Sequence, residues 1–325
     1  MPKPKLISGI QPTGPLHLGN YLGALKNFVA LQNSEKYDCY FFIADYHSLT
    51  IGFDPRQKTK QILDLVNTYI ASGIDPKKSV IFAQSQTPAC TELAWILNTI
   101  TPIGELERMT QFKDKAREQE TNINAGLFTY PALMASDILL YDAKFVPVGD
   151  DQLQHLELTR TLARKFNNKF GKVFTEPQPL LTKNPRVMSL DNPAKKMSKS
   201  LPSGCLFLND SPAAIEQKIK RAVTDSGNEI KYDPQNKAGI SNLLNIYSAL
   251  SDNSISNIEE KCINKGYGEF KTALAKIIIK SLEPFRKPPT SNLQLQTILS
   301  SGAKKANKIS SAKLKQIKKK LGLSF

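Results

Sequence analysis

Short apolar runs alternate with helical patterns through the first half of this 325-residue chain. The runs are nearly all apolar, which is typical of parallel strands buried on both faces, and apolar residues at helical spacing follow each of them. We therefore predict strands at residues 5–9, 37–44, 79–84 and 145–149, and helices at residues 17–33, 56–72, 89–101, 130–141 and 150–166. This alternation predicts an α/β fold with a Rossmann-like, doubly wound parallel sheet.

The pattern changes after about residue 188, where helical spacing continues but few strand signals remain. Helices are predicted at residues 211–223, 240–250, 254–264, 267–284, 292–300 and 303–321. A chain of this length is expected to hold two domains. We therefore expect a Rossmann-like catalytic domain at residues 1–188, and at residues 189–325 a charged loop followed by an all-helical domain with a basic C-terminal helix.

Nothing in the chain predicts export or a membrane. No apolar run approaches the roughly 18 residues of a membrane span, and the first residues have neither an apolar signal region nor an Arg/Ser-rich presequence. The four cysteines, Cys39, Cys90, Cys205 and Cys262, form no Cys-x-x-Cys pair. We expect a cytoplasmic protein with reduced thiols and no metal site built by the chain.

The C-terminal end is strongly basic. The chain carries a formal net charge of +15, Glu283 is its last acidic residue, and eight lysines fall between Lys304 and Lys320. Positive charge without acidic residues indicates a polyanionic partner. The alternative is an amphipathic helix whose lysines only face solvent.

The segment at residues 9–20 joins the first strand to the first helix. Ligands of open α/β sheets bind where strands end, and helix N-termini offer N–H groups to anions. Gly9, Gly14 and Gly19 allow a ligand close to the backbone, and His17 could donate to phosphate oxygens. The alternative is an ordinary strand–helix turn with a surface histidine.

A second segment, Lys196-Met197-Ser198-Lys199-Ser200, offers two lysines and two hydroxyls on a loop. Lysines serve as point charges for phosphates, and a loop lets them close on a bound nucleotide. The alternative is a lysine-rich linker in a basic protein.

Together and in this order, the two segments resemble the HIGH and KMSKS elements of class I aminoacyl-tRNA synthetases. Longer strings, at residues 104–113, 130–141, 146–152, 222–226 and 243–248, resemble the bacterial tryptophanyl-tRNA synthetases. The resemblance runs from about residue 7 to about residue 321. It implies a Rossmann catalytic domain and a helical anticodon-recognition domain.

The resemblance implies an amino-acid site for tryptophan. Asp137 would accept the indole N–H, while Met134, Val146 and Val148 would wall the ring. The remaining residues assigned to this site are Gly9, Gln11, His47, Tyr130 and Gln152, of which Tyr130 and Gln152 would hold the amino group and Gln11 would lie near the carboxylate.

The resemblance also implies an ATP site. The residues that would surround adenosine and the rest of ATP are Gln11, Pro12, Thr13, Gly19, Asn20, Gly149, Asp150, Asp151, Val187, Met197, Ser198 and Ser200. The residues assigned to catalysis at the phosphates are His17, Lys115, Lys196 and Lys199. Two positions depart from the family pattern, because Asn20 replaces the second histidine of HIGH and Ile7 replaces an expected aromatic residue.

The Asp137 assignment agrees with simple chemistry. A neutral indole has one hydrogen-bond donor and no acceptor, and its bond to a carboxylate contributes roughly 1.5–3 kcal/mol. A ligand without that N–H leaves a buried group unpaired, so rejection by about 10⁴-fold can result. The alternative is a helix-surface acid, which the apolar neighbours of Asp137 disfavour.

The implied reaction has two steps, in which tryptophan is activated with ATP and then transferred to tRNA(Trp). Catalysis would come from positioning and charge stabilisation. Mg²⁺ would accompany the phosphates of ATP, and the chain shows no carboxylate cage of its own for it. The resemblance also implies a homodimer.

Two other functions remain open at this point. A tyrosyl-tRNA synthetase would share the fold and chemistry, but the indole-pocket strings and the lack of an obvious extra C-terminal RNA-binding domain disfavour it. A non-catalytic tRNA-binding or regulatory paralogue is disfavoured by the presence of Asp137, Gln152, Lys196 and Lys199.

Overall fold

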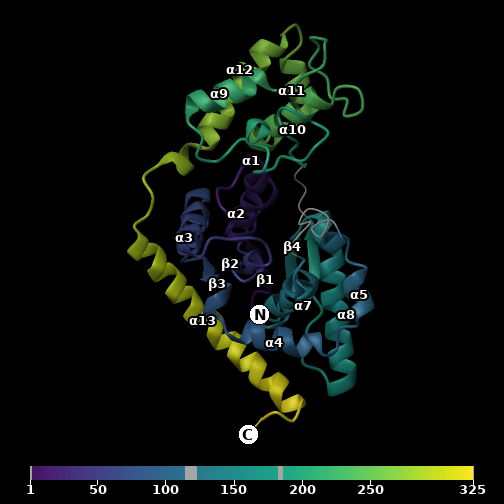
Figure 1. Cartoon of the computed structure of the whole chain (residues 1–325). Helices are drawn as coiled ribbons and strands as arrows, with labels where there is room; N and C mark the ends of the chain where they lie inside the picture. The colour runs from purple at the N-terminus through teal and green to yellow at the C-terminus, as the bar shows by residue number, and fades with distance from the viewer. Residues whose placement is uncertain (1, 114–122, 182–185, 325) are drawn as a thin grey trace. The chain divides into compact units, whose positions relative to one another are not determined.

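The structure, a computed structural model, describes residues 2–113, 123–181 and 186–324 (Figure 1). It divides into two compact units. Unit 1 comprises Met1–Gly14, Phe28–Thr182 and Thr290–Phe325, and unit 2 comprises Pro15–Asn27 and Lys183–Pro289.

Unit 1 contains a five-stranded sheet in the order β3-β2-β1-β4-β5, in which every pair is parallel. The strands are β1 (Lys5–Ile10), β2 (Asp38–Ile43), β3 (Ser79–Ala83), β4 (Phe145–Val148) and β5 (Gln178–Leu181). This order confirms the Rossmann-like fold, with four of its strands predicted from the sequence. Because β1 and β4 lie side by side at the point where the strand order reverses, their carboxyl ends form the usual ligand position of such sheets.

The helices of unit 1 cover the sheet and supply most of its core. Among the described residues they are most of α2 (Lys26–Asn33), α3 (Pro55–Ser72), α4 (Ala89–Asn98), α5 (Ile103–Glu107), α7 (Ala125–Leu139), α8 (Leu153–Phe170) and α13 (Asn292–Lys320). The Asp54 side chain caps α3 by accepting from the Arg56 N–H, and Gly73 ends this helix at φ +103°, a left-handed conformation that glycine adopts readily. Helix α7 packs between α4 and α8 through Leu93, Ala135 and Leu162, all fully buried.

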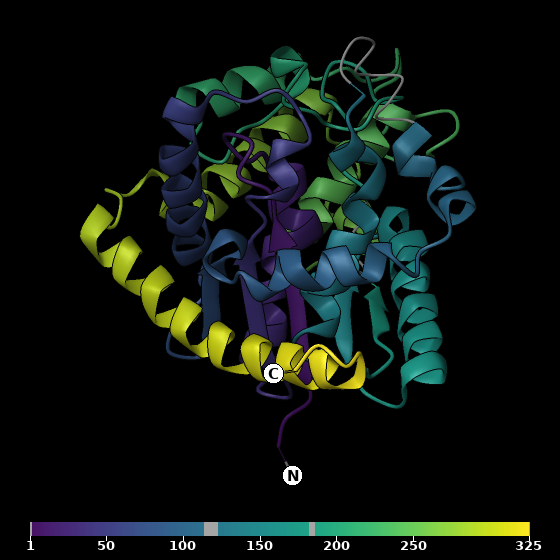
Figure 2. The ribbon, with the colours of Figure 1, turned by 60° about the horizontal axis from the view of Figure 1, so that its bottom comes forward.

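The basic C-terminal helix α13 corrects two expectations. It is one helix, where the sequence predicted a break near Gly302. A Cβ at Gly302 would lie 1.8 Å from the carbonyl oxygen of Ile81, so the glycine lets α13 lie directly on β3 (Figure 2). The helix therefore belongs to unit 1 and not to the expected domain at residues 189–325.

Unit 2 begins with residues 15–27, which the sequence placed in the first domain. Leu18 N–H donates to Leu206 O at 2.8 Å, and Leu208 N–H donates to Leu16 O at 3.0 Å. These bonds join the start of the first helix to the segment after the lysine-rich loop, so the expected boundary at residue 188 does not separate them.

The predicted helix at residues 17–33 is present in three pieces. They are α1 (Leu18–Asn20), a π-helical turn at Tyr21–Leu25, and α2 (Lys26–Asn33). Such π-turns often mark functional sites.

The other α-helices of unit 2 lie after residue 211, in the part that the structure describes. They are α9 (Pro212–Arg221), α10 (Ala238–Ser251), α11 (Ile255–Lys261) and α12 (Tyr267–Ser281). Helices α9 and α12 pack together and bury Ile219, Leu274 and Ile278 completely. Across the described parts of both units, no helix is both long and apolar enough to cross a membrane.

Candidate functional site

His17 lies at the N-terminus of α1 in unit 2, and its surroundings explain the residues that follow it. The Asn20 side chain accepts the His17 backbone N–H at 3.1 Å, so the residue that departs from the HIGH pattern serves as a helix cap. A Cβ at Gly19 would lie 3.0 Å from Cε1 of the His17 ring. Gly19 therefore makes room for the imidazole.

The His17 imidazole is buried, and its Nδ1 has no hydrogen-bond partner among the described residues. Burial, followed by the charges of Lys199 and Lys196, lowers the pKa of His17 from 6.5 to about 4. The ring is therefore neutral at pH 7, and its Nδ1 is a buried polar atom without a partner in the described part of the chain. A neutral imidazole can still donate one hydrogen bond to a phosphate oxygen.

The KMSKS segment is a compact turn anchored to a short antiparallel ladder. Met197 N–H donates to Val187 O at 3.1 Å, and Ser189 N–H donates to Lys195 O at 2.8 Å. Because the Val187 Cβ is 3.6 Å from a Cβ placed on Gly19, the ladder lies beside the start of α1. The structure thus brings residues 17–20, at the start of α1, together with the KMSKS segment, residues 196–200, within one unit.

The residues of this turn differ in exposure. Met197 is buried, Lys196 is exposed and Lys199 is half-buried. Burial lowers the pKa of the Lys199 ammonium, because desolvation disfavours the charged form. A polyanionic ligand would stabilise that charge.

One anchor of this ladder was missed by the sequence analysis. The Asn242 side chain on α10 accepts from Met188 N–H at 2.9 Å and donates to Met188 O at 3.0 Å. Both polar backbone groups of Met188 are thereby held in place. No sequence signal indicates this, since the two residues are 54 positions apart.

Asp137 on α7 is a buried carboxylate of unit 1, with 4% of its surface exposed. Its Oδ2 lies 2.8 Å from Nε2 of His47, and Nε2 of Gln84 donates to Oδ1 at 2.9 Å and Oδ2 at 2.8 Å. The alternative of a solvent-facing acid is therefore wrong. Burial, and then the Asp137 carboxylate, raises the pKa of the Cys90 thiol, which also faces this group.

Gln84 was not assigned to the site by the sequence analysis. It directly follows β3, and the rule that ligands bind at the carboxyl ends of parallel strands could have identified it. Its side chain is 1% exposed, so it can serve only buried partners.

Asp137, His47 and Gln84 form a cluster, called the Asp137 cluster below. Tyr130 lies near it, on the same helix as Asp137. Its hydroxyl is 2.8 Å from Nε2 of His155, and its ring centroid is 6.1 Å from that of His47. Burial, and then the charge of Asp151, raises the pKa of Tyr130 to about 12. The hydroxyl therefore stays protonated at pH 7.

All the residues assigned to tryptophan fall in unit 1. Val146 and Val148 are buried, Met134 and Gln152 are half-buried, and a Cβ on Gly9 would lie 2.7 Å from the Phe42 ring. The residues assigned to ATP are divided, with Gln11, Pro12, Thr13, Gly149, Asp150 and Asp151 in unit 1 and the others in unit 2. Lys115 lies outside the described residues.

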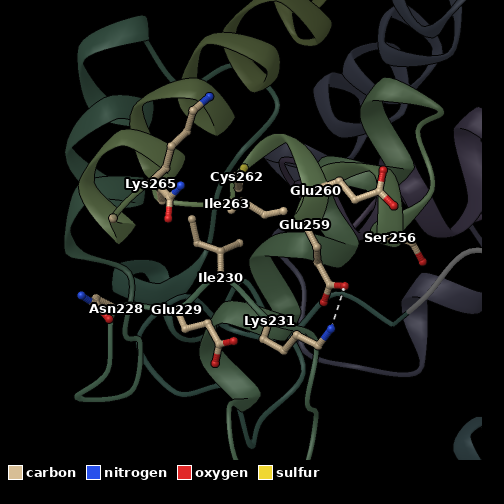
Figure 3. A pocket seen from close by; sticks show the side chains of 12 residues that line it. Asn228, Glu229, Ile230, Lys231, Ser256, Glu259, Glu260, Cys262, Ile263 and Lys265 are labelled. Atoms are coloured by element: carbon tan, nitrogen blue, oxygen red, sulfur yellow. Dashed lines mark hydrogen bonds and ion pairs between the residues drawn. The ribbon is translucent and has the colours of Figure 1, made fainter.

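One cavity in unit 1 borders Tyr130, and a second cavity lies elsewhere, in unit 2. The first, of about 320 Å³, is lined by Tyr130, Leu49 and Trp95, among others. The second, of about 710 Å³, between the residue 228–231 segment and residues 256–266, contains none of the residues assigned to ATP. Figure 3 shows Glu259 and Lys231 paired at its wall, 3.4 Å apart.

Comparisons with known proteins identify the family to which the chain belongs. A family model described as class I tRNA synthetases (W and Y) matches residues 2–283. A protein of Bacillus anthracis named tryptophan–tRNA ligase is 48% identical over 325 residues, covering 98% of each chain.

Two solved structures also resemble the chain at 36% identity. The tryptophanyl-tRNA synthetase of Mycoplasma pneumoniae has a TM-score of 0.90 and covers 99% of this chain and 98% of its own. That of Campylobacter jejuni, complexed with ADP and tryptophan, has a TM-score of 0.82 and covers 98% of this chain and 100% of its own.

The state of His17 gives a testable expectation. In the free protein its imidazole should titrate near pH 4, as measured by NMR with assignment from a His17→Asn variant. Because the folded pKa lies below the unfolded value of 6.5, the unfolded chain binds the proton first, and this group makes the fold less stable as pH falls from 6.5 to 4. Lys199→Ala should raise the pKa part of the way, and a value near 6.5 in the unaltered protein would contradict the geometry.

Proposed function

The chain belongs to the class I tRNA synthetases of the tryptophan and tyrosine family, and we propose that it is an ATP-dependent tryptophan–tRNA ligase. The observation that carries the choice of amino acid is the buried Asp137 carboxylate, with His47 and Gln84 bonded to it. A buried group that can only accept hydrogen bonds suits a ligand whose single polar ring atom is a donor.

The first step forms tryptophanyl-adenylate. A carboxylate oxygen of tryptophan attacks the α-phosphorus of ATP, and the bond from that phosphorus to the β-phosphate oxygen breaks to release pyrophosphate. In the second step a ribose hydroxyl at the 3′ end of tRNA(Trp) attacks the carbonyl carbon, and AMP leaves. ATP enters as its magnesium complex.

We assign the phosphates to His17, Lys196 and Lys199, with Lys115 as a further candidate from the sequence. The support for His17 is its buried Nδ1, which lacks a partner among the described residues. Charge builds up on the leaving pyrophosphate as the bond breaks, and lysines placed at that position stabilise the transition state. Asn20, Gly19, Val187 and the other residues assigned to ATP are proposed to surround the nucleotide.

We assign tryptophan to the Asp137 cluster of unit 1. Met134, Val146 and Val148 supply the apolar contacts of the ring, and Tyr130, Gln152 and Gln11 are proposed to hold the amino and carboxylate groups. The Tyr130 hydroxyl stays protonated at neutral pH because its pKa is raised to about 12, so it can donate or accept.

We propose that two copies associate through the exposed apolar residues Leu49 and Trp95, which line the same cavity, and Phe53, which follows Leu49 by four positions in the chain. These side chains are 42%, 46% and 72% exposed, and exposed apolar clusters of this kind mark interaction surfaces. Trp95 is the single tryptophan of the chain, so its emission should shift to the blue when the copies associate. Sedimentation equilibrium that finds only monomer at micromolar concentration would contradict the dimer.

We propose that tRNA contacts the helical part of unit 2 and the lysines of α13. Lys304, Lys305, Lys308 and Lys315 are exposed and have no ion pair among the described residues. Lys305 and Lys308 line a cavity of about 450 Å³ together with Lys77 and Lys78. We propose that the protein acts in the cytoplasm, where tRNA and ATP are used for translation.

Not all lysines of α13 can serve this role. Lys313 lies 2.7 Å from Asp142 and donates to Val173 O at 2.9 Å, and Lys318 pairs with Glu92. These two lysines hold α13 on the rest of unit 1. The lysines of α13 therefore form two groups, those that stabilise the helix and those that face solvent.

The first test is ATP–pyrophosphate exchange with tryptophan, tyrosine and phenylalanine. Exchange should run with tryptophan and be strongly reduced with the other two. Asp137→Asn should raise the tryptophan KM by roughly 10- to 150-fold, which corresponds to a lost charged hydrogen bond of about 1.5–3 kcal/mol. Exchange that is as fast with tyrosine would support the tyrosine enzyme instead, and no exchange with any amino acid would support the non-catalytic paralogue.

A second test separates the two kinds of lysine on α13. Replacing Lys304, Lys305, Lys308 and Lys315 with Gln should weaken tRNA binding and flatten its dependence on salt, since fewer counterions are released, while exchange stays unchanged. Lys313→Gln is the matched control, and it should lower stability by about 1–3 kcal/mol without changing the salt slope. Equal tRNA affinity and slope in the fourfold variant would show that these lysines only solubilise the helix.

A further inference from the structure

We infer that Gln84 is a positioning residue that fixes the Asp137 carboxylate as the acceptor for the indole N–H. This inference rests on the proposed tryptophan function. Gln84 lies in the turn after β3, His47 in the turn after β2, and Asp137 on α7. Three separate segments therefore converge on one carboxylate.

The orientation of the Gln84 amide follows from its other partners. Its Oε1 accepts the backbone N–H of Tyr46 at 3.1 Å and lies 3.4 Å from that of His47. A backbone N–H can only donate, so the oxygen must face it and the NH₂ group must face Asp137. The backbone of Gln84 is held as well, because the Thr87 N–H and the Thr87 hydroxyl both donate to its backbone carbonyl oxygen.

This arrangement determines what Asp137 can offer to a ligand. Both of its oxygens accept an N–H of Gln84, and Oδ2 also faces His47. A carboxylate has about four lone-pair positions. The Gln84 and His47 contacts occupy three of them, and a ligand N–H would compete for the remaining one only with the weakly donating Cys90 thiol. The Gln84 nitrogen lies within 2.9 Å of both oxygens and, together with His47 at Oδ2, holds the carboxylate in place for a ligand.

A simpler role for Gln84 would be to satisfy buried polar groups of the core. A substitution that changes the charge of residue 84 but keeps its shape distinguishes the two roles, because only the positioning role predicts a change in how tryptophan binding depends on pH. Gln84→Glu keeps the size and the oxygen that faces Tyr46, but places an oxygen where the NH₂ group faced Asp137. Two carboxyl groups at hydrogen-bond distance must share a proton, because both cannot remain charged side by side.

The pH dependence follows from this shared proton. At low pH the proton bridges the two groups and Asp137 can still be oriented. As pH rises the shared proton is lost and the carboxylates repel, so tryptophan binding should weaken. The other titratable groups around the cluster are Asp45, Tyr46, His47, Cys90, Tyr130 and Tyr141. They are present in the unaltered protein and in Gln84→Glu alike, so a difference between the two pH profiles comes from residue 84.

The experiment measures the tryptophan KM and kcat in ATP–pyrophosphate exchange from pH 6 to 9. For Gln84→Glu the KM should rise at least tenfold across this range relative to the unaltered protein, while kcat at saturating tryptophan stays within about threefold. Gln86→Glu is the matched control. Gln86 lies two residues after Gln84, and its Oε1 accepts the Ala83 N–H. The pH profile of the tryptophan KM in Gln86→Glu should follow that of the unaltered protein.

Gln84→Met covers the case in which the charged variant does not fold. It removes both donors without adding a charge, so the tryptophan KM should rise about tenfold with no new pH dependence, and preference over tyrosine should fall. A pH-independent loss in Gln84→Glu, or unchanged preference in a folded Gln84→Met, would overturn the positioning role. Absence of tryptophan exchange in the unaltered protein would instead overturn the proposed function.

Discussion

The common direction of the five strands decides where the chemistry of unit 1 lies. Because every pair of strands is parallel, the turns after β1, β2, β3 and β4 meet at one edge of the sheet. His47 and Gln84 come from two of these turns and bond to the same carboxylate on α7. Burying Asp137 without partners would be costly, so the sheet, the two turns and α7 stabilise one another through this cluster.

The segments assigned to phosphate are organised differently. In unit 2 the start of α1 and the KMSKS turn are held by short backbone ladders, through Leu18 with Leu206 and Val187 with Met197. Burial, followed by the charges of Lys199 and Lys196, keeps the His17 imidazole neutral. The cationic charge of this region is therefore carried by Lys196 and Lys199 and not by His17.

The sequence predicted the elements whose signals are local. Four strands and most helices were confirmed, because apolar periodicity and caps such as Asp54 and Gly73 act over a few residues. Strand β5 was missed because it is a four-residue edge strand containing Pro179, and proline is confined to such edges. The break expected in α13 was wrong because Gly302 serves close packing against Ile81, a contact between distant segments.

The contrast between local signals and contacts of distant segments applies to the site as well. Asp137 and His47 were identified through family resemblance, and the structure places them 2.8 Å apart. Gln84 and Asn242 were missed because their roles depend on partners tens of residues away. The solvent-facing and paired lysines of α13 could not be distinguished by spacing alone, since the difference depends on Asp142 and Glu92 in other elements.

The central claim is that Asp137 recognises the indole N–H, and one binding measurement tests it most directly. Calorimetry should compare tryptophan with 3-(3-benzothienyl)alanine, in which sulfur replaces the N–H in a ring of nearly the same shape. We expect the sulfur analogue to bind at least about tenfold more weakly, which corresponds to about 1.4 kcal/mol. Equal affinity for the two ligands would contradict the account.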